Sequence, residues 1–391
     1  MEKILFKIKS LGIGGIERLT IDILNELTIE NKEIILMLEN REENELKGQL
    51  NKNIEVIYLK PEWFNPLLYK IRDKKKNLFF KFLYNILLFL ERFILSYNIN
   101  KYIRINKETK LFIDYNGGST KYIHHIKKVK KILWCHTSIS HMSEGKIKRY
   151  GKKLFKYDLV VAICEEMENE LLKNYPYLRD KIKTIYNFVD LEKILLKLKV
   201  DNDIVKNKKL LEDDYCVSIG RIVETKDYFT TIKAFQILKR KGIYKKLYIV
   251  GDGPNIKKLE QYIKKLNMKD QIILLGMQEN PYIWLKNADF FIHSSKIEGF
   301  PMVLLEAMAC EKIIISSICK TGVKEILDLG VGEGFRIGDY KELAILIEKV
   351  LKMPKEEKES KYISNIKKNI NKFSKQVILK EYKDIMIKYS I

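Results

Sequence analysis

Near the middle of its second half the chain reads Glu298-Gly-Phe-Pro-Met-Val-Leu-Leu-Glu306-Ala-Met-Ala309, soon after an apolar run at 290–294 that predicts a strand. Pro301 favours a helix start, because its missing N–H would be unpaired in a first turn anyway. Glu298 then lies on the loop at the carboxyl end of the strand, and Glu306 lies about a turn and a half into the helix. Ligands of open α/β sheets bind at this edge, beside helix N-termini that favour anions. We therefore expect both carboxylates to face one ligand, since a carboxylate in an apolar helix is costly without hydrogen-bond partners.

Short apolar runs alternate with amphipathic helical patterns along the rest of the chain. The first series of predicted strands covers residues 4–8, 33–38, 111–115, 131–135 and 159–163. The second series covers residues 215–219, 246–250, 271–275, 290–294 and 313–316. Alternation of strands and helices indicates the α/β class, with parallel, doubly wound sheets.

The length of 391 residues suggests two domains. Residues 191–214 separate the two strand series; they are charged and contain no clear strand, so we expect a linker there. The first domain would then cover residues 1–190, and the second would cover residues 215–372. Residues 373–391 have an amphipathic helical pattern after the second series has ended, and this helix could pack on either domain.

Basic residues are in excess and unevenly placed. The net charge is +22, and residues 70–156 alone hold 22 Lys/Arg against 5 Asp/Glu. A Lys-rich, Ile-rich composition of the whole proteome would explain the total, but it would spread the charge along the chain. The concentration in one segment favours a surface for anionic lipids or phosphates.

The five cysteines are scattered without a Cys-x-x-Cys pair, and the first residues show no signal-peptide pattern. Both features predict a reducing, cytoplasmic environment. No spacing of His, Cys, Asp or Glu resembles a metal site, so we expect no metal.

The most apolar window, residues 78–90, is interrupted by Lys81 and Asn85 and closed by Glu91 and Arg92. It is too short and too broken to span a bilayer. The interpretation that we favour is a helix packed on a sheet. The alternative is a helix that lies in the membrane interface, helped by three lysines at 74–76. Whether residues 78–97 touch a membrane or pack in the core is open at this point.

A glycine-rich loop, residues 10–18, directly follows the first predicted strand. Gly14 and Gly15 would let a ligand approach the backbone, and the following helix would offer free N–H groups to phosphate. The loop is not a dinucleotide fingerprint, which needs glycine where Glu17 stands, and it lacks the Gly-Lys-Ser/Thr of a P-loop. A simple tight turn is the alternative.

Two cations follow the first strand of the second series. Arg221 comes directly after Gly220, and Lys226 lies one short loop further on, so both would lie at the carboxyl edge of the second sheet. Two cations there can neutralise a diphosphate without a metal. Solvated surface charges are the alternative, although arginine is scarce in this chain. In the first half, His136 follows a predicted strand, where an imidazole can bond a sugar hydroxyl or an acceptor.

Taken together, these motifs resemble the family 4 glycosyltransferases. Glu298 and Glu306 are similar to the Glu-x7-Glu signature of that family, including its Glu-Gly-Phe-Pro start. Arg221 and Lys226 are similar to its Arg-x4-Lys pair, and the loop at 14–18 resembles its first glycine loop. The resemblance is strong over residues 215–330, moderate over 1–30 and weak over 40–130, where acceptor-binding segments usually diverge.

The resemblance implies the GT-B fold, in which two Rossmann-like, doubly wound domains face a cleft and the terminal helix at 373–391 returns to the first domain. It also implies a retaining, metal-independent transfer from a nucleotide sugar, in the first place a UDP-sugar, without a further cofactor. The resemblance also implies which residues hold the donor. Glu306 would hold the ribose and Glu298 the transferred sugar, helped by backbone N–H groups from Gly299 through Phe300 to Pro301. The diphosphate would be held by Arg221, Lys226, Gly14 and Gly15. The catalytic set would be His136, near the donor sugar and the acceptor, with Glu298, Arg221 and Lys226.

Two other classes of function account for fewer of these residues. A glycoside hydrolase would use Glu298 and Glu306 as acid and nucleophile or base, but it would not need Arg221, Lys226 or the glycine loop. A nucleic-acid-binding protein would use the basic segment, but no nucleic-acid module accompanies that charge. We therefore expect an enzyme that moves a hexose or N-acetylhexosamine to a lipid-linked or surface-polysaccharide acceptor, as in capsule or lipopolysaccharide. It would work at the anionic inner face of the cell membrane.

Overall fold

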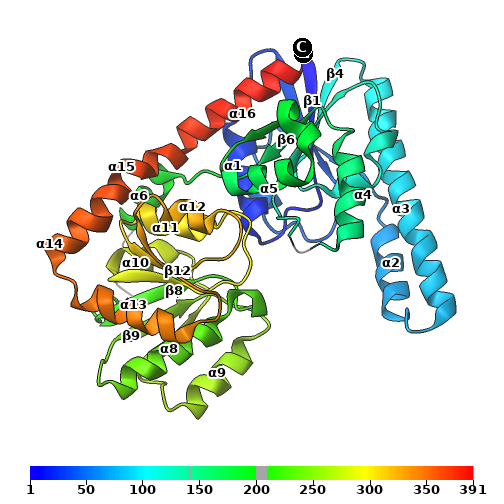
Figure 1. Ribbon diagram of the computed structural model, residues 1–391. Helices are drawn as coiled ribbons and strands as arrows, with labels where there is room; N and C mark the ends of the chain where they lie inside the picture. The colour runs from blue at the N-terminus through cyan, green and yellow to red at the C-terminus, as the bar shows by residue number, and fades with distance from the viewer. Residues whose placement is uncertain (141, 200–208, 391) are drawn as a thin grey trace. The chain divides into compact units, whose positions relative to one another are not determined.

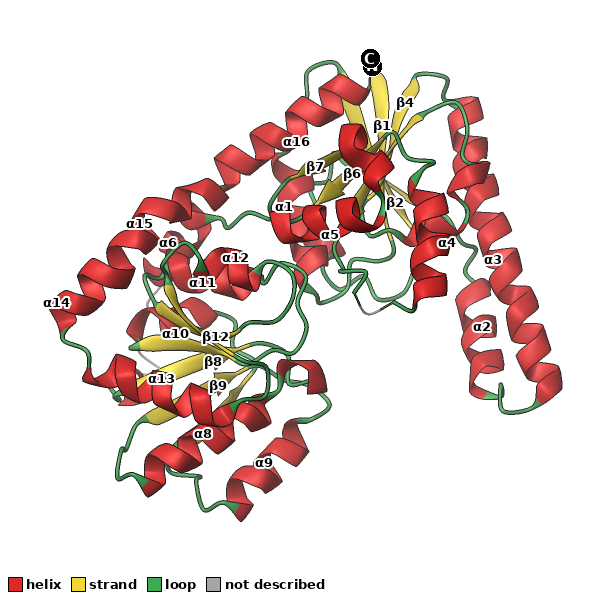
Figure 2. Cartoon of the chain, in the orientation of Figure 1, coloured by secondary structure: helices red, strands yellow, loops and turns green. Residues whose placement is uncertain are grey.

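The computed structural model describes residues 1–140, 142–199 and 209–390 (Figure 1). The chain divides into two compact units. Unit 1 contains Met1–Ile163, Met167–Ile185 and Leu379–Ile391, and unit 2 contains Cys164–Glu166 and Tyr186–Ile378. Each unit is built on a parallel β-sheet accompanied by helices (Figure 2).

The sheet of unit 1 has seven parallel strands in the order β3-β2-β1-β4-β5-β6-β7. The strands are β1 (Glu2–Ile8), β2 (Lys32–Leu38), β3 (Glu55–Tyr58), β4 (Thr109–Asp114), β5 (Lys130–Cys135), β6 (Leu159–Ala162) and β7 (Ile182–Thr184). The helices are α1 (Gly15–Glu26), α2 (Phe64–Asp73), α3 (Leu78–Ile105), α4 (Glu144–Leu154) and α5 (Glu165–Asn174). Parallel strands that are covered on both faces read as apolar runs, and Ile4, Leu5 and Phe6 of β1 are accordingly buried.

The sheet of unit 2 has six parallel strands in the order β10-β9-β8-β11-β12-β13. The strands are β8 (Tyr215–Ile219), β9 (Lys246–Val250), β10 (Ile272–Gly276), β11 (Phe290–His293), β12 (Ile313–Ser317) and β13 (Gly332–Phe335). The helices are α6 (Leu191–Lys199), α8 (Tyr228–Arg240), α9 (Ile256–Lys265), α10 (Pro281–Asn287), α11 (Met302–Ala309), α12 (Val323–Leu327), α13 (Tyr340–Lys352), α14 (Lys355–Lys358) and α15 (Ser364–Asn369). A last helix, α16 (Lys375–Tyr389), begins in unit 2 and ends in unit 1.

All ten predicted strands are present, which confirms the α/β class and the two parallel, doubly wound sheets. Three strands were not predicted: β3, β7 and β13. Each of them lies at an edge of its sheet, and most of its residues are only partly buried. An edge strand that is half covered needs no continuous apolar run, so its pattern in the sequence is weak.

The stretch 191–214, predicted to be a linker, contains helix α6, and its residues 200–208 lie outside the described part of the chain. Helix α6 packs against α10 and α11, so it is part of unit 2. The long segment of unit 2 begins before this stretch, at Tyr186. The reason is an aromatic cluster, in which the ring of Tyr186 packs against the rings of Phe300 and Phe373.

The helical pattern predicted at the end of the chain is helix α16, and from Leu379 onward it belongs to unit 1. The hydroxyl groups of Tyr382 and Tyr115 lie 3.1 Å apart and share a buried hydrogen bond. The ring of Tyr382 also stacks on Trp134, with 4.8 Å between the ring centroids. The end of the chain therefore packs on the sheet of unit 1 through Tyr382, which contacts Tyr115 just after β4 and Trp134 in β5.

The favoured interpretation of residues 78–90, a helix packed on a sheet, is wrong. This window belongs to the 28-residue helix α3, whose first half pairs with α2 in a helical hairpin that extends away from the sheet of unit 1 (Figure 1). The buried core that the two helices share is small and consists of Phe64, Leu68, Ile71 and Leu87. The apolar window predicted burial because its residues lie on every side of the helix, but α2 covers only one side.

Candidate active site

Two of the predicted residues meet at the carboxyl edge of the sheet in unit 2. Lys226 ends a short turn in the loop that follows β8, and Glu298 lies in the loop that follows β11. Strands β8 and β11 are neighbours in the sheet, so their loops lie side by side. The ammonium group of Lys226 forms a short ion pair with Oε1 of Glu298.

A third residue of this cluster, His293 at the end of β11, was not predicted. Its Nε2 atom lies 2.8 Å from Oε1 of Glu298, and its Nδ1 atom lies 2.9 Å from the hydroxyl oxygen of Ser316 on β12. An ionised carboxylate only accepts hydrogen bonds, so we assign the proton to Nε2, which donates to Glu298. In a neutral ring, Nδ1 then accepts from the Ser316 hydroxyl. One signal could have found His293: it is an imidazole inside an otherwise apolar strand that leads to the loop of Glu298.

The cluster holds Glu298 as a carboxylate. Burial alone would raise the pKa of Glu298, but the hydrogen bond from His293 and the charge of Lys226 outweigh burial and lower this pKa to about 2. Burial lowers the pKa of His293 by more than the hydrogen bond and the charge of Glu298 raise it, so the ring is neutral at neutral pH. Only 12% of the Glu298 side chain is exposed, so these neighbours rather than water set its charge. Glu298 is fitted to accept hydrogen bonds and is poorly fitted to give up a proton.

Glu306 lies in helix α11, where the sequence places it, and the hydroxyl of Tyr282 donates to its Oε1 atom at 3.3 Å. The helix begins directly after Pro301, which caps it. One part of the donor assignment needs correction: Pro301 has no backbone N–H. Only Gly299 and Phe300 can offer backbone donors in this segment, and the side chain of Phe300 is itself buried.

Arg221 follows β8 and Gly220 directly, and its side chain is exposed. The loop that carries it is held by the next loop of the sheet, because the N–H of Gly220 donates to the carbonyl oxygen of Val250 at 3.0 Å. Gly251 has a φ of +141°, and a side chain there would overlap the backbone of Gly220. The glycine at 251 therefore lets two strand-end loops pack backbone against backbone, which fixes the start of the loop with Arg221 and Lys226.

In unit 1, His136 follows β5 as the sequence predicts. Its ring packs edge-on against Tyr115, with 4.7 Å between the centroids. Both ring nitrogens are buried, and neither meets hydrogen-bond geometry with any residue that the structure describes. Burial lowers the pKa of His136 to about 4, against a smaller effect of the Tyr115 backbone, so the ring is neutral. A neutral imidazole carries one donor and one acceptor nitrogen, so it is able to bind a hydroxyl group of a ligand.

The predicted glycine loop of unit 1 leads into helix α1, which begins at Gly15 with Gly14 as its N-terminal cap. Gly15 has open space around it, as a close-approaching ligand would need. Gly14 does not, because the carboxylate of Glu17 folds over it. This carboxylate occupies the favourable side of the helix N-terminus, so an anion would have to displace it.

A buried charge cluster at the carboxyl ends of β1, β2 and β4 was also not predicted. Lys7 is completely buried; it pairs closely with Glu39, and its Nζ atom lies 3.5 Å from Oδ1 of Asp114. The hydroxyl of Tyr157 and the backbone N–H of Ser119 both donate to the other oxygen of Asp114, at 2.9 Å. Burial would lower the pKa of Lys7, but the charge of Glu39 outweighs it and raises this pKa. Because a single buried cation, Lys7, contacts both carboxyl groups, we assign this cluster to the stability of unit 1.

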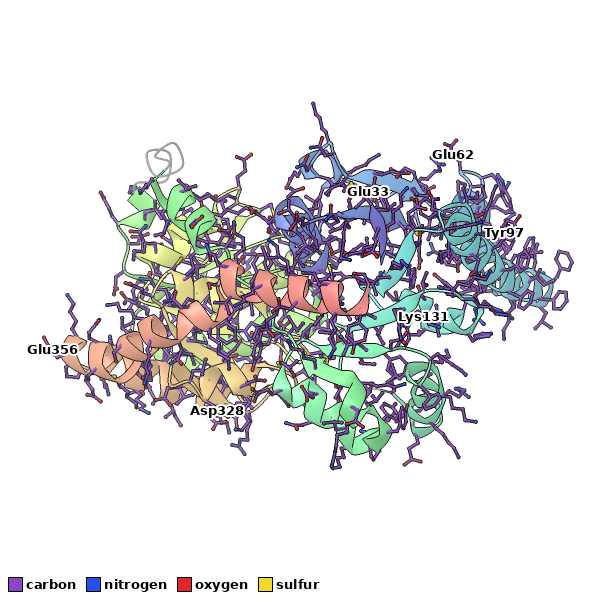
Figure 3. All side chains as sticks on the ribbon, turned by 90° about the horizontal axis from the view of Figure 1, so that it is seen from above. Glu33, Glu62, Tyr97, Lys131, Asp328 and Glu356 are labelled. Carbon is purple, nitrogen blue, oxygen red and sulfur yellow. The ribbon has the colours of Figure 1, made fainter. Side chains whose placement is uncertain are left out.

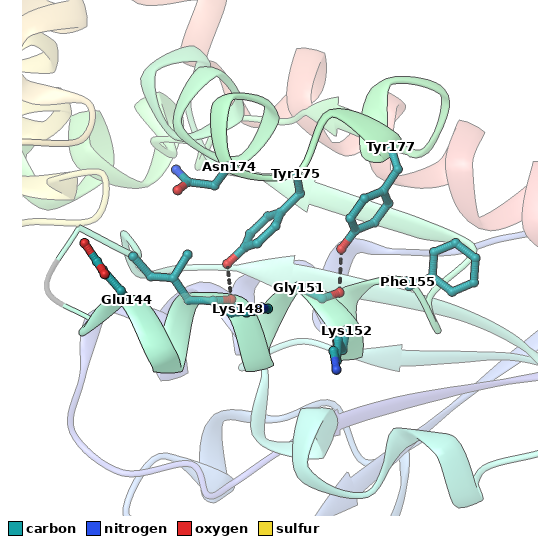
Figure 4. Close-up of a pocket in the computed structure, with 9 residues that line it drawn as sticks. Glu144, Lys148, Gly151, Lys152, Phe155, Asn174, Tyr175 and Tyr177 are labelled. Carbon is teal, nitrogen blue, oxygen red and sulfur yellow. Dashed lines mark hydrogen bonds between the residues drawn. The ribbon is translucent and has the colours of Figure 1, made fainter.

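Unit 1 contains a pocket beside helix α4, whose lining residues are drawn in Figure 4. Its volume is about 500 Å³. It is lined by Glu144, Ile147, Lys148, Gly151, Lys152, Phe155, Asn174, Tyr175 and Tyr177. The hydroxyl groups of Tyr175 and Tyr177 donate to the backbone carbonyls of Ile147 and Gly151 and so join the two walls. No predicted site residue lines this pocket, so it is separate from the predicted donor residues.

Two family models match the chain. Residues 199–369 match the model described as glycosyl transferases group 1, and residues 115–193 match the model described as glycosyltransferase family 4. The first match contains Lys226, Glu298 and His293, and the second contains His136. The cluster at the edge of the sheet therefore lies within the group 1 domain.

Similar proteins agree with the two models. An uncharacterized glycosyltransferase of Methanocaldococcus jannaschii is 28% identical over 297 residues, which cover 72% of this chain and 68% of that protein. The N-acetylgalactosamine-N,N'-diacetylbacillosaminyl-diphospho-undecaprenol 4-alpha-N-acetylgalactosaminyltransferase of Campylobacter jejuni is 32% identical over 171 residues, 44% of each chain. The structure of Anabaena HepE in complex with UDP and glucose has a TM-score of 0.74 at 20% identity, covering 99% of this chain and 100% of that one. The chain is therefore a glycosyltransferase that contains a group 1 domain and a family 4 domain, and it has the GT-B fold.

Proposed function

We propose that this glycosyltransferase moves a hexose or N-acetylhexosamine from a UDP-sugar to a lipid-linked or surface-polysaccharide acceptor, with retention and without a metal. The observation that carries the proposal is the cluster of Lys226, Glu298 and His293 at the carboxyl edge of the sheet, where ligands of α/β folds bind. The ammonium group of Lys226 can bind a diphosphate, and the ionised carboxylate of Glu298 can accept hydrogen bonds from the hydroxyl groups of a sugar. The UDP and glucose bound to Anabaena HepE support this class of donor.

The chemistry follows from the charges at this edge. When the bond between the sugar and the phosphate breaks, negative charge grows on the departing diphosphate. Lys226 and the exposed Arg221 are cations on one short loop, so they can stabilise this charge with little reorganisation. Attack on the face that the diphosphate leaves would let the diphosphate accept the proton of the acceptor hydroxyl. Such a transfer retains the configuration at the sugar and needs no protein base.

The charge state of Glu298 weighs against its use as the acid of a hydrolase. A glycosidase needs one carboxyl group that is protonated near neutral pH, which requires a raised pKa. The pKa of Glu298 is instead lowered to about 2 by its neighbours. Glu298 in the role of a hydrogen-bond acceptor to the donor sugar, with Glu306 on the ribose, fits this state better.

The acceptor is proposed on two grounds. The name of the Campylobacter jejuni relative contains an undecaprenol-linked sugar as its substrate. The basic segment, with 22 Lys/Arg against 5 Asp/Glu over residues 70–156, lies in the half of the chain that carries the family 4 match. Lipid-linked intermediates of capsule and lipopolysaccharide synthesis would meet such a surface at the inner face of the membrane, with the enzyme bound peripherally.

A thermal-shift panel of nucleotide sugars tests the donor. A ligand at a hundred times its Kd stabilises the protein by about 2.7 kcal/mol, which is a measurable rise in melting temperature. UDP and one UDP-sugar should give the largest rise, both with and without EDTA. A rise that EDTA abolishes would contradict metal independence, and a panel without any rise would overturn the proposed donor class.

The variant Glu306→Ala tests the ribose assignment. It should raise the KM for the donor, while an exposed glutamate of the same unit changed in the same way, Glu260→Ala, serves as the control. Full activity of Glu306→Ala at low donor concentration would show that Glu306 does not hold the ribose.

A further inference from the structure

The helical hairpin of α2 and α3 is built differently from the rest of unit 1. Its two helices run side by side and extend from the sheet, while only the second half of α3 returns to the body through buried residues such as Leu95 and Ile99 (Figures 1 and 2). The two helices share a core of four buried residues, supported by partly buried ones on α3. This small core holds the hairpin together, but it uses only one face of α3.

The opposite face of α3 is an exposed apolar stripe. The stripe consists of Leu78, Phe79, Phe82, Ile86, Phe89, Leu90, Phe93 and Tyr97, each between 38% and 82% exposed. Their spacing of three and four residues places them within about 120° of the helix circumference and over a length of about 29 Å. Figure 3 shows Tyr97 among the side chains that extend outward from α3. Four exposed phenylalanines in one stripe exceed the scattered apolar residues that soluble surfaces normally carry.

Basic residues flank the stripe at one end and along one edge. Residues 64–105 contain nine Lys/Arg and two acidic residues, Asp73 and Glu91. Three exposed lysines, at 74–76, form the turn of the hairpin, and the exposed Lys81 and Arg92 lie along one edge of the stripe. Glu91 is already paired with Lys60 at 2.8 Å. The apolar face is therefore framed by positive charge that the hairpin itself does not neutralise.

We propose that the hairpin is a membrane-docking device: the stripe inserts into the interface of an anionic lipid surface, and the basic turn binds the headgroups. An amphipathic helix with an apolar face and flanking Lys/Arg lies flat in such an interface, with its apolar side chains below the headgroups. None of the described helices, α3 included, is long and apolar enough to cross a bilayer, which agrees with a helix that lies on it. The inference deepens the proposed function, on which it rests for the presence of a lipid-linked acceptor at that surface.

A second copy of the chain fits this surface less well. Two hairpins related by a twofold axis would bury their stripes together, but they would also bring two basic frames close to each other. Like charges at an interface cost several kcal/mol unless other groups neutralise them. A lipid surface with negative headgroups satisfies the stripe and the frame at the same time, so it is the occupant that we infer.

Vesicle flotation with the full-length protein tests the apolar part of the proposal. Phosphatidylcholine vesicles with about 30% phosphatidylglycerol, without nucleotide or acceptor, should bind the wild type at low ionic strength. The double variant Phe82→Ser/Phe89→Ser should bind at least tenfold more weakly, because two large apolar side chains no longer enter the interface. The double variant Phe82→Leu/Phe89→Leu should keep most of the binding.

A matched control uses two apolar residues of unit 2 with the same exposure. Phe82 and Phe89 are 65% and 68% exposed, and Leu196 and Ile345 are 64% and 61% exposed. The variant Leu196→Ser/Ile345→Ser should bind vesicles as the wild type does. Equal losses in the two serine variants would overturn the proposal, since the stripe would then be no different from other exposed apolar residues.

The electrostatic part has its own variant. Changing the lysines at 74–76 to glutamine should weaken binding to anionic vesicles by roughly a hundredfold, and about 0.5 M salt should weaken wild-type binding in the same way. These lysines are exposed, so this variant carries the test even if the serine variant unfolds. Binding that ignores both the lysine change and salt would overturn the proposal.

The oligomeric state separates lipid from a second copy as the occupant. Sedimentation velocity should show the same state for the wild type and for Phe82→Ser/Phe89→Ser. A wild-type dimer that the variant dissociates, with vesicle binding unchanged, would assign the stripe to self-association instead. Because the vesicles contain neither donor nor acceptor, failure here leaves the nucleotide thermal shift untouched and so is distinguishable from failure of the proposed reaction.

Discussion

Replacing Glu298 by glutamine tests the charge state of the active-site cluster, because it removes the charge and nearly keeps the shape. The neighbours of Glu298 lower its pKa to about 2, from 4.5 for the free side chain. A lowering of this size corresponds to about 3.4 kcal/mol of stability at pH 7 and to about 1.4 kcal/mol at pH 3. A carboxylate whose pKa is lowered by folding stabilises the folded state. This stabilisation is complete at pH values above the pKa of the unfolded chain, and it is lost as the pH falls through the pKa of the folded state. The stability gap between the wild type and Glu298→Gln should therefore narrow by about 2 kcal/mol between pH 7 and pH 3.

The assay is urea unfolding at several pH values in this range, followed by tryptophan fluorescence. Trp284 is buried and is the tryptophan of unit 2 among the described residues, so the part of the fluorescence change that it contributes reports the unit that contains Glu298. Glu260→Gln, at an exposed position of α9, is the control and should give a gap that does not change with pH. A gap between the wild type and Glu298→Gln that stays constant, or widens as the pH falls, would refute the inference that Glu298 is a stabilised carboxylate.

Five further variants test the site and its support. Lys226→Met should lower kcat/KM by roughly a hundredfold to a thousandfold in a sugar-transfer assay and remove the thermal shift with UDP, because the diphosphate loses a cation. His293→Phe should lower kcat roughly tenfold to a hundredfold, whereas His293→Gln, which can still donate to Glu298, should recover most of it. Lys7→Met should cost about 3–5 kcal/mol in urea unfolding, because it leaves buried carboxylates without their cation. Gly251→Ala should lower the melting temperature by several degrees, since its side chain would overlap the loop before Arg221.

The central part of the fold could be predicted from the sequence because it follows one simple rule. A parallel strand with helices on both faces must be apolar along its whole length, and such a run is visible without any knowledge of its partners. The runs at 4–8 and 290–294 are of this kind, and the structure has strands at both. The motifs after these strands could be placed at one edge for the same reason, because all strands of a doubly wound sheet point the same way.

The peripheral parts could not be predicted, because their side chains are only partly covered. The edge strand β13 contains two glycines and a glutamate among its four residues, so no apolar run marks it. For helix α3 the sequence predicts too much burial: its window is apolar enough for a buried helix, although no residue that the structure describes covers one of its faces. Hydrophobicity reports what a residue prefers as its surroundings, and it does not say whether protein or lipid supplies them.

The active-site cluster shows the same limit for polar residues. Glu298 and Lys226 stand in motifs with recognisable spacing, whereas His293 and Ser316 come from two strands whose pairing is known only from the sheet. A sequence can suggest that an imidazole lies near a carboxylate, but the ring of His293 is held in place by the hydroxyl that the neighbouring strand presents to its Nδ1 atom. The charge of Glu298 therefore depends on three segments that are distant in the chain. It is this dependence that makes the pH profile of Glu298→Gln a test of the folded site rather than of the motif.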